Sequence, residues 1–170
     1  MHPAVVAGIL AVVVMASQSC TATSPTEGTA WSAGSPEIRE CGAPQDVTPA
    51  TFASALEDGG CSTLVLAPGA YGPLAVSDRS GGVLTIRCQQ PGTCVASDSR
   101  LSRVDGVIID GLRFEGGGEN LNIDKSMNVK VQNSSFNRAS GAALRAVGRP
   151  TENTQILSNS IRNDQLGCNV

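Results

Sequence analysis

Short runs of alternating apolar and polar residues recur along the second half of this chain at a nearly constant spacing. Three segments that align with one another begin at Val107, Val129 and Thr154, 22 and then 25 residues apart. Each contains β-branched apolar residues, then small or polar residues, then one large apolar residue. A period in the twenties with short β-type runs and no long helical pattern is typical of solenoids. The pattern therefore predicts an all-β chain wound into a parallel β-helix.

The same pattern extends upstream, and a second short run accompanies it in each repeat. Further copies of the first run lie at 64–71 and 83–87, and the second runs lie at 73–76, 101–104, 121–124 and 143–147. Alternation points Leu121 and Ile123 inward and Asn122 and Asp124 outward. We count about five coils, more than the three or so that a repeat protein needs to bury a continuous core.

The register of these coils predicts which side chains stack in the core. One inward column would hold Ile109, Val131 and Ile156, and another would hold Phe114, Phe136 and Ile161. Polar residues follow the apolar runs at the expected corners, namely Asn133, Ser158 and Asn159. Asparagine tolerates the left-handed backbone conformation, and stacked polar side chains can form hydrogen-bonded ladders. The alternative is that these residues are ordinary polar loop residues.

Composition supports a narrow core and argues against one class of partner. Aromatic residues make up 3% of the chain and charged residues 16%, whereas glycine occurs 19 times. Stacked coils are filled by Val, Ile, Leu and Ala, and glycine serves their corners. The net charge of −3 argues against nucleic acid as a partner, because the phosphate backbone requires a basic surface.

The first 45 residues predict export. Residues 4–16 are an apolar run too short to span a bilayer but suited to a signal peptide, which we place at 1–19. Cys20 then follows small residues, as at a bacterial lipidation site, and plain cleavage near Ser19 or Ala22 is the alternative. Residues 20–45 are rich in Thr, Ser, Gly and Pro and are interpreted as a flexible tether. We expect an extracytoplasmic protein, either secreted or anchored to a membrane by lipid.

Export permits disulfides, and the cysteine spacing favours two of them. Cys88 and Cys94 flank a Gln-Gln-Pro-Gly-Thr turn that brings its ends together. Cys41 would then pair with Cys61 around a helix, which leaves Cys168 over. A zinc site is disfavoured, because the chain has no Cys-x-x-Cys motif and its one histidine is His2.

One segment predicts a helix that caps the solenoid. Thr48 is suited to the N-cap, Pro49 to the first helical position and Gly59 to the stop, and Phe52 and Leu56 form one apolar face. Solenoids need caps over their open cores, although a simple surface helix is the alternative. No second cap precedes Val170, so we expect that the C-terminal end of the β-helix is missing from the chain or that a partner covers it.

Three segments carry a resemblance to a known family: 63–71, 82–87 and 106–114. Taken in order, they resemble the opening coils of right-handed parallel β-helix proteins of the pectin-lyase-like superfamily, closest to the alginate and chondroitin lyases. The resemblance spans residues 46–170 and implies a right-handed β-helix there. It also implies an acidic polysaccharide ligand, with calcium or a basic side chain neutralising the uronate carboxylate. No family catalytic residue maps onto a motif here, so catalytic residues stay unassigned, and we expect this stretch of chain to be inactive alone.

The residues themselves predict one binding face. If Leu121 and Leu144 stack, Asn122 and Arg145 stack outside them, with Asp124 beside and Asn169 on the next coil. Oxygen-rich side chains next to an arginine suit an acidic sugar or a calcium ion. The alternative is an ordinary solvated face. Glu119 and Asn120 follow three glycines and are interpreted as a flexible loop beside this face.

Two functional hypotheses follow from these features. In the first, an exported β-helix binds or processes an acidic polysaccharide, as the N-terminal portion of a lyase that cleaves by β-elimination. In the second, the chain is a non-catalytic cell-surface module for adhesion or spacing, or a truncated remnant. The fold alone does not choose between them.

Overall fold

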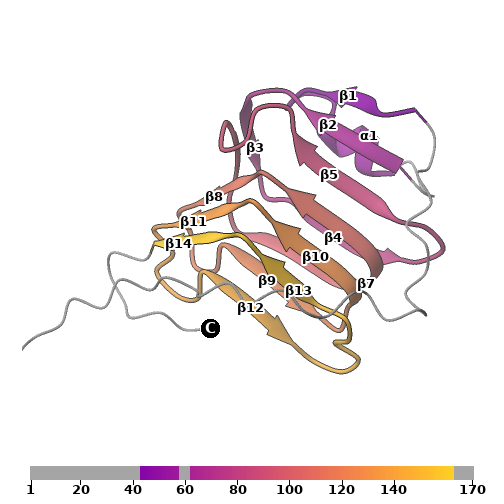
Figure 1. The fold of residues 1–170 in the computed structure, drawn as a ribbon, viewed down its shortest axis with the longest axis vertical. Coiled ribbons are helices and arrows are strands. Elements are labelled where there is room, and N and C mark those ends of the chain that lie inside the picture. The colour runs from indigo at the N-terminus through magenta and orange to yellow at the C-terminus, as the bar shows by residue number, and fades with distance from the viewer. Residues whose placement is uncertain (1–42, 58–61, 163–170) are drawn as a thin grey trace, which may run out of the picture.

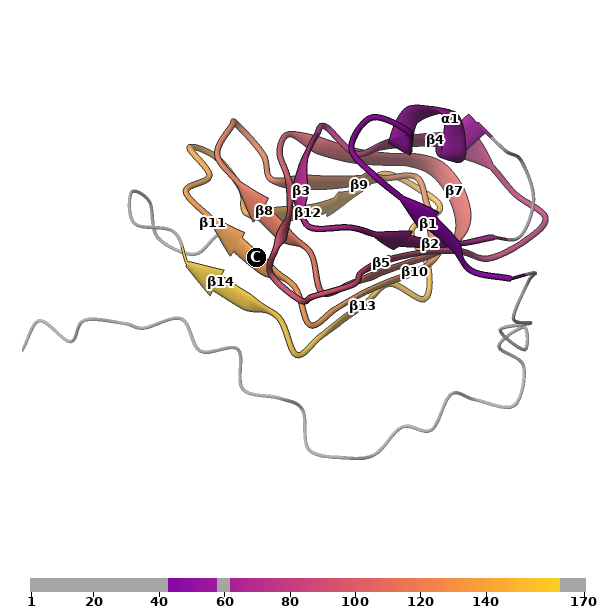
Figure 2. The ribbon, with the colours of Figure 1, turned by 90° about the horizontal axis from the view of Figure 1, so that it is seen from above.

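The computed structural model describes residues 43–57 and 62–162, which form a parallel β-solenoid of about five turns (Figures 1 and 2). Each turn contributes strands to three parallel sheets, which we call sheets A, B and C. The predicted all-β solenoid is therefore confirmed. Within the described ranges, no helix is long and apolar enough to cross a lipid bilayer.

The three sheets are built by strands that recur in the same order along the chain. Sheet A contains β1 (Gln45–Val47), β2 (Ser62–Leu66), β5 (Leu84–Cys88), β7 (Ser99–Asp110), β10 (Met127–Gln132) and β13 (Gln155–Leu157). Sheet B contains β3 (Gly69–Gly72), β6 (Cys94–Ala96), β8 (Arg113–Glu115), β11 (Ser135–Asn137) and β14 (Ser160–Arg162). Sheet C contains β4 (Ala75–Arg79), the first half of β7, β9 (Leu121–Asp124) and β12 (Leu144–Val147). Strand β7 bends from sheet C into sheet A.

The predicted core columns are in register. Val131 pairs with Ile109 on one side and Ile156 on the other, and Phe136 pairs with Phe114 and Ile161. The two phenylalanine rings are stacked, with centroids 4.8 Å apart. Most of these side chains are fully buried, but Ile156 in the last described turn is 38% exposed. The alternation of apolar and polar residues therefore fixes the register correctly.

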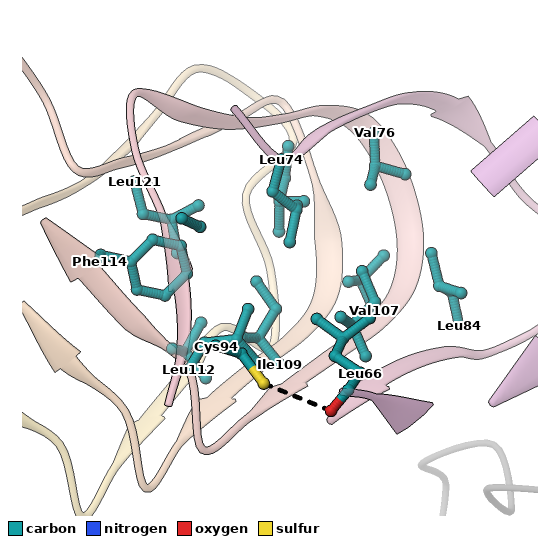
Figure 3. Close-up of a cluster of buried hydrophobic side chains, with 14 of the residues drawn as sticks. Leu66, Leu74, Val76, Leu84, Cys94, Val107, Ile109, Leu112, Phe114 and Leu121 are labelled. Atoms are coloured by element: carbon teal, nitrogen blue, oxygen red, sulfur yellow. Dashed lines mark hydrogen bonds between the residues drawn. The ribbon is translucent and has the colours of Figure 1, made fainter. Parts of the chain in front are cut away.

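Aliphatic side chains from all three sheets meet in one narrow core (Figure 3). Its largest fully buried members include Leu66, Leu74, Ile109, Phe114 and Leu121. Because successive turns place similar side chains above one another, each layer is filled by the layer next to it. This packing explains why a chain with 3% aromatic residues still has a continuous interior.

A repeated two-residue motif forms several corners of the turns. Lys125 adopts the left-handed conformation (φ 49°), and the next residue, Ser126, is fully buried. The Ser126 hydroxyl accepts a hydrogen bond from the Val104 amide of the preceding turn at 3.2 Å and donates one to the Asp124 carbonyl at 2.8 Å. The same arrangement recurs at Asp98–Ser99 and Asn133–Ser134, with the amides of Leu74 and Leu112 as donors.

The predicted polar corners recur in the next turn, but the Asn159 side chain bonds backbone groups of the preceding turn and not another corner side chain. Asn133 and Ser158 both have positive φ, at 50° and 54°. The side chain of Asn159 accepts a hydrogen bond from the Ser134 amide and donates one to the Val131 carbonyl, each at 2.8 Å. These corner side chains satisfy backbone groups that the bends between sheets would otherwise leave buried and unpaired.

Replacing Ser126 by alanine is expected to destabilise the protein by about 1–3 kcal/mol, because the Val104 amide would keep its buried position and lose its acceptor. Denaturant unfolding followed by circular dichroism measures this loss. Ser80→Ala is the matched control, since Ser80 is exposed and should change stability by less than about 0.5 kcal/mol. Equal effects of the two variants would contradict the assigned role of the corner hydroxyl.

Helix α1 (Phe52–Glu57) covers the N-terminal end of the core, as predicted, although it begins later than the sequence suggested. Thr51, and not the predicted Thr48, directly precedes the helix and accepts its first hydrogen bond, from the Ala55 amide at 3.0 Å. Thr48 closes the turn before it, because its amide donates to the Thr51 hydroxyl at 3.1 Å and its carbonyl accepts from the Thr51 amide at 3.0 Å. Phe52 is buried and meets Tyr71 edge to face, with ring centroids 5.2 Å apart. The predicted stop at Gly59 lies outside the described residues.

One of the two predicted disulfides is present. Cys88 and Cys94 are bonded, with their Cα atoms 5.8 Å apart, across the turn between β5 and β6. The dashed line in Figure 3 joins Cys94 Sγ to the Leu66 carbonyl oxygen, 3.4 Å away. Because this sulfur is oxidised and carries no hydrogen, we treat the approach as a packing contact. The predicted Cys41–Cys61 pair, the Cys20 lipidation site, Cys168 and residues 1–42 lie outside the described ranges.

Candidate functional site

The predicted binding residues come together on the outer face of sheet C. Strands β9 and β12 pair so that Arg145 is the partner of Asn122, as the sequence predicted. Strand β7 adds Arg100 to the same row, as the partner of Asn122 on its other side. We call the row Arg100, Asn122 and Arg145, together with Glu119 and Asp124 beside it, the sheet C face. The predicted fourth residue, Asn169, lies outside the described part of the chain.

Glu119 joins two of the predicted residues through its two carboxylate oxygens. It accepts a hydrogen bond from Asn122 Nδ2 at 2.6 Å and an ion-pair contact from Arg145 Nη1 at 2.8 Å. Sequence reasoning treated Glu119 as part of a turn and missed this role. The available signal was its position three residues before Asn122 and two residues before the strand that carries the face.

The second carboxylate of the face binds an arginine that the sequence prediction also missed. Arg100 Nη2 lies 3.0 Å from Asp124 Oδ2. The offset of 22 residues between Arg100 and Asn122 equals the first repeat spacing, so the repeat itself could have identified Arg100. Asp124 is therefore paired with a neighbouring turn and does not stand free beside Arg145.

The glycine-rich segment next to this face is tightly held, which corrects the prediction of a flexible loop. The Gly118 amide donates to Asp98 Oδ1 at 2.8 Å, and the Gly117 carbonyl accepts from the Ser140 amide at 3.0 Å. Gly117 has a φ of 77°, and a side chain there would collide with the Asp98 carboxylate. Asn120 is fully buried and donates to the Asn137 carbonyl at 3.0 Å. Glu119 is therefore presented by a hydrogen-bonded segment.

Both arginines of the face remain open to solvent. The Arg100 and Arg145 side chains are 59% and 52% exposed, and each contacts its carboxylate partner through a single nitrogen. A guanidinium has five N–H donors in a fixed fork, so each arginine keeps donors that a ligand carboxylate can use. The chemistry that this face supports is therefore anion binding by positioned guanidinium groups.

The described residues do not assemble a metal centre. Within 43–57 and 62–162, no group of three or more histidine, cysteine, aspartate or glutamate side chains is placed to hold a metal ion. The two carboxylates of the sheet C face are each engaged by an arginine. Calcium usually takes six to eight oxygen ligands. A calcium ion at this face would therefore need most of its oxygens from the ligand and water.

Comparison with protein-family models, with curated proteins and with solved structures found no match.

Proposed function

We propose that this protein is an exported β-solenoid that binds an acidic polysaccharide along the sheet C face. The observation that carries the proposal is the row of Arg100, Asn122 and Arg145 across three neighbouring strands. Neighbouring strands lie about 4.7–4.9 Å apart, so the two arginines are spaced by about 10 Å across the sheet. A row that crosses the strands suits an extended ligand with carboxylates at regular intervals.

The existing ion pairs do not prevent such binding. Exposed salt bridges contribute only about 0–1 kcal/mol, because both partners are well solvated when separated. A ligand carboxylate can therefore use the free nitrogens of Arg145 or displace Glu119 at little cost. Asn122 adds an amide next to the arginines, which can hydrogen bond to sugar hydroxyls.

The resemblance to pectin-lyase-like β-helices supports the same class of ligand. Sugar-acid polymers are the substrates that this resemblance implies, and a solenoid face is where they would bind. Processing by β-elimination belongs to the same proposal, with this stretch as the N-terminal portion of a lyase. The second candidate function is a non-catalytic adhesion or spacer module. It is favoured by the arginine–carboxylate pairing of the sheet C face, which leaves neither acid unpaired as a base.

Export is part of the proposal and has one structural support. The Cys88–Cys94 disulfide is the kind of bond that forms and persists outside the reducing cytosol. Together with the apolar segment at 4–16 and the cysteine at position 20, it favours a secreted or lipid-anchored protein. Mass spectrometry of the exported chain would distinguish an acylated Cys20 from a plain cleaved end.

Replacing Arg145 by alanine is expected to weaken binding to an acidic polysaccharide by about 10–100-fold, the effect of losing one charge-assisted hydrogen-bonded contact of about 1.5–3 kcal/mol. Its exposed side chain predicts a stability change below about 0.5 kcal/mol. Parent and variant should be titrated calorimetrically with alginate, pectate and chondroitin, with and without calcium. Loss of the Asp124 side chain should weaken binding only where calcium is required, because without calcium it leaves Arg100 free for the ligand.

Two further variants sharpen this experiment. Arg138→Ala removes the same charge from a side chain that is 72% exposed and pairs with Glu115 on sheet B, so its binding should equal that of the parent. Glu119→Gln keeps an acceptor for Asn122 and releases Arg145, so its binding should equal or exceed that of the parent. If the parent binds none of the polymers, the polysaccharide proposal fails. If Arg145→Ala binds as the parent does, the face is not the site.

A lyase assay separates the two candidate functions. Incubation of the same polymers with the protein should produce ultraviolet-absorbing unsaturated sugars if the chain processes them. Binding without any such absorbance would support the adhesion or spacer module.

A further inference from the structure

A cavity lies between helix α1 and strand β4, at the N-terminal end of sheet C. Its volume is about 450 Å³, and its walls include Phe52, Leu56, Tyr71, Ala75 and Arg79, together with the acidic Glu57. Strand β4 pairs with β7 on one side only among the described strands, so its other edge faces α1 with unpaired backbone groups. The cavity therefore combines aromatic and aliphatic walls with polar backbone groups along one side.

Arg79 is one of the residues that line this cavity. Its Nε and Nη2 atoms are both buried, and neither has a hydrogen-bond partner in the described part of the chain. Arg79 is the register partner of Val104, which is buried. The corresponding side chain in the turn after that is the buried hydroxyl of Ser126. Arg79 is therefore the one charged residue in the column that it forms with Val104 and Ser126. Its two unsatisfied N–H groups destabilise the folded state.

In another arginine of this protein, the Nε and Nη2 atoms bind a carboxylate. Arg103 donates from Nε and Nη2 to the two oxygens of Asp78, and the Nη2 contact measures 2.7 Å. This hydrogen bonding lowers the pKa of the Asp78 carboxyl and raises that of Arg103. Arg79 follows Asp78 directly, and within the described ranges no carboxylate bonds its Nε or Nη2, although Glu57 lines the same cavity. The Nε–Nη2 edge of a guanidinium matches a carboxylate through two parallel hydrogen bonds.

The cavity is continuous with the sheet C face. Ala75 lines the cavity and is also the register partner of Arg100, which pairs in turn with Asn122. One row of outward positions therefore leads from Arg145 across the sheet to the cavity mouth. Ser77, a second exposed residue of β4, lies on the same side of the strand.

We propose that this cavity holds the terminal uronate of an acidic glycan, with its carboxylate on the Arg79 fork and its ring against the walls formed by Phe52, Tyr71 and Leu56. The inference rests on the proposed polysaccharide function and adds recognition of a chain end. A rotamer change turns the Arg79 nitrogens from their buried position into the cavity, where the carboxylate satisfies both of them. Sugar hydroxyls take the unpaired backbone groups of β4. The remaining sugars extend over Ala75 toward Arg100 and Arg145.

The test uses single sugars as well as polymers, on the full exported chain. Glucuronate and galacturonate should bind the parent in a titration followed by NMR, whereas neutral glucose should bind at least about tenfold more weakly for lack of the charge-assisted contact. Arg79→Met should weaken uronate binding by about 10–100-fold through loss of the bidentate pair. The same variant should keep or raise the melting temperature, because it removes two unsatisfied buried donors. Arg79→Lys should also bind weakly, since it lacks the planar fork.

Matched controls and outcomes separate this site from the sheet C face. Arg87→Met removes an equal charge from an exposed position on sheet A and should leave uronate binding unchanged. If Arg79→Met lowers the melting temperature and binds uronate like the parent, the residue is structural and the inference is overturned. If polymer binding depends on Arg145 but not on Arg79, the inference fails while the polysaccharide function stands. If uronate binding depends on Arg79 and the protein binds no polymer, the cavity is a uronate site and the polysaccharide function is overturned.

Discussion

Replacing Val131 by aspartate is expected to abolish the cooperative melting transition of the parent at neutral pH. Val131 is fully buried between its register partners Ile109 and Ile156. A carboxyl group there would have neither a cation nor a hydrogen-bond donor opposite it. The cost would exceed about 4–5 kcal/mol, which is comparable with the whole stability of many domains. Differential scanning calorimetry and far-ultraviolet circular dichroism would measure the loss.

The neighbouring residue supplies the control. Lys130→Asp places the same side chain one position away, on the outward side of β10, where alternation directs it to solvent. We expect that variant to melt within a few degrees of the parent. If Val131→Asp melts like Lys130→Asp, the inward column is assigned to the wrong register, because a one-residue shift exchanges the two faces of a strand.

Truncating Phe136 to alanine is the second change with a large expected effect. The Phe136 ring is fully buried and stacks on Phe114, with ring centroids 4.8 Å apart and 6° between the ring planes. Removing it deletes the burial of one ring and leaves a cavity beside the other. We expect a loss of about 3–5 kcal/mol in the free energy of unfolding, measured by denaturant titration.

A conservative variant distinguishes volume from ring stacking. Phe136→Leu keeps most of the apolar volume and should lose clearly less than the alanine variant. Truncation should also weaken sheet B on both sides, because Phe136 is the register partner of Ile161 as well as Phe114. A loss below about 1 kcal/mol for Phe136→Ala would show that this column does not support the core.

The solenoid itself was predictable because its repeats are enforced by burial. Inward positions must be apolar in every turn. The spacing between Ile109 and Val131 therefore indicates the repeat length from one sequence alone. The corner motif was predictable only in part. Asn133 was recognised as a turn residue, because asparagine favours the left-handed conformation. Lys125 adopts the same conformation, but lysine has no such preference from which it could be predicted. There, the buried serine that follows fixes the backbone.

The candidate site was less predictable, for a physical reason. Register placed Asn122 beside Arg145 correctly, because backbone pairing determines which outward residues are neighbours. Side-chain pairing on an exposed face depends on energies near 0–1 kcal/mol, and no sequence pattern records them. The roles of Glu119 and Arg100 are therefore visible only in the folded structure. The same holds for the fork of Arg79, because its isolation depends on where helix α1 lies relative to β4.

The corner motif has a consequence for how such a chain can grow. Asp105 and Met127 are register partners 22 residues apart, and the Ser126 hydroxyl closes the turn between them onto Val104. A tandem in-frame duplication of the gene segment for 105–126 would add one turn whose new serine meets the equivalent backbone amide of the turn before it. The strands on both sides of each junction would keep their register. Sheet C would lengthen by about 4.8 Å per copy. The number of repeats in the gene would then set the length of the longest ligand that the sheet C face can bind.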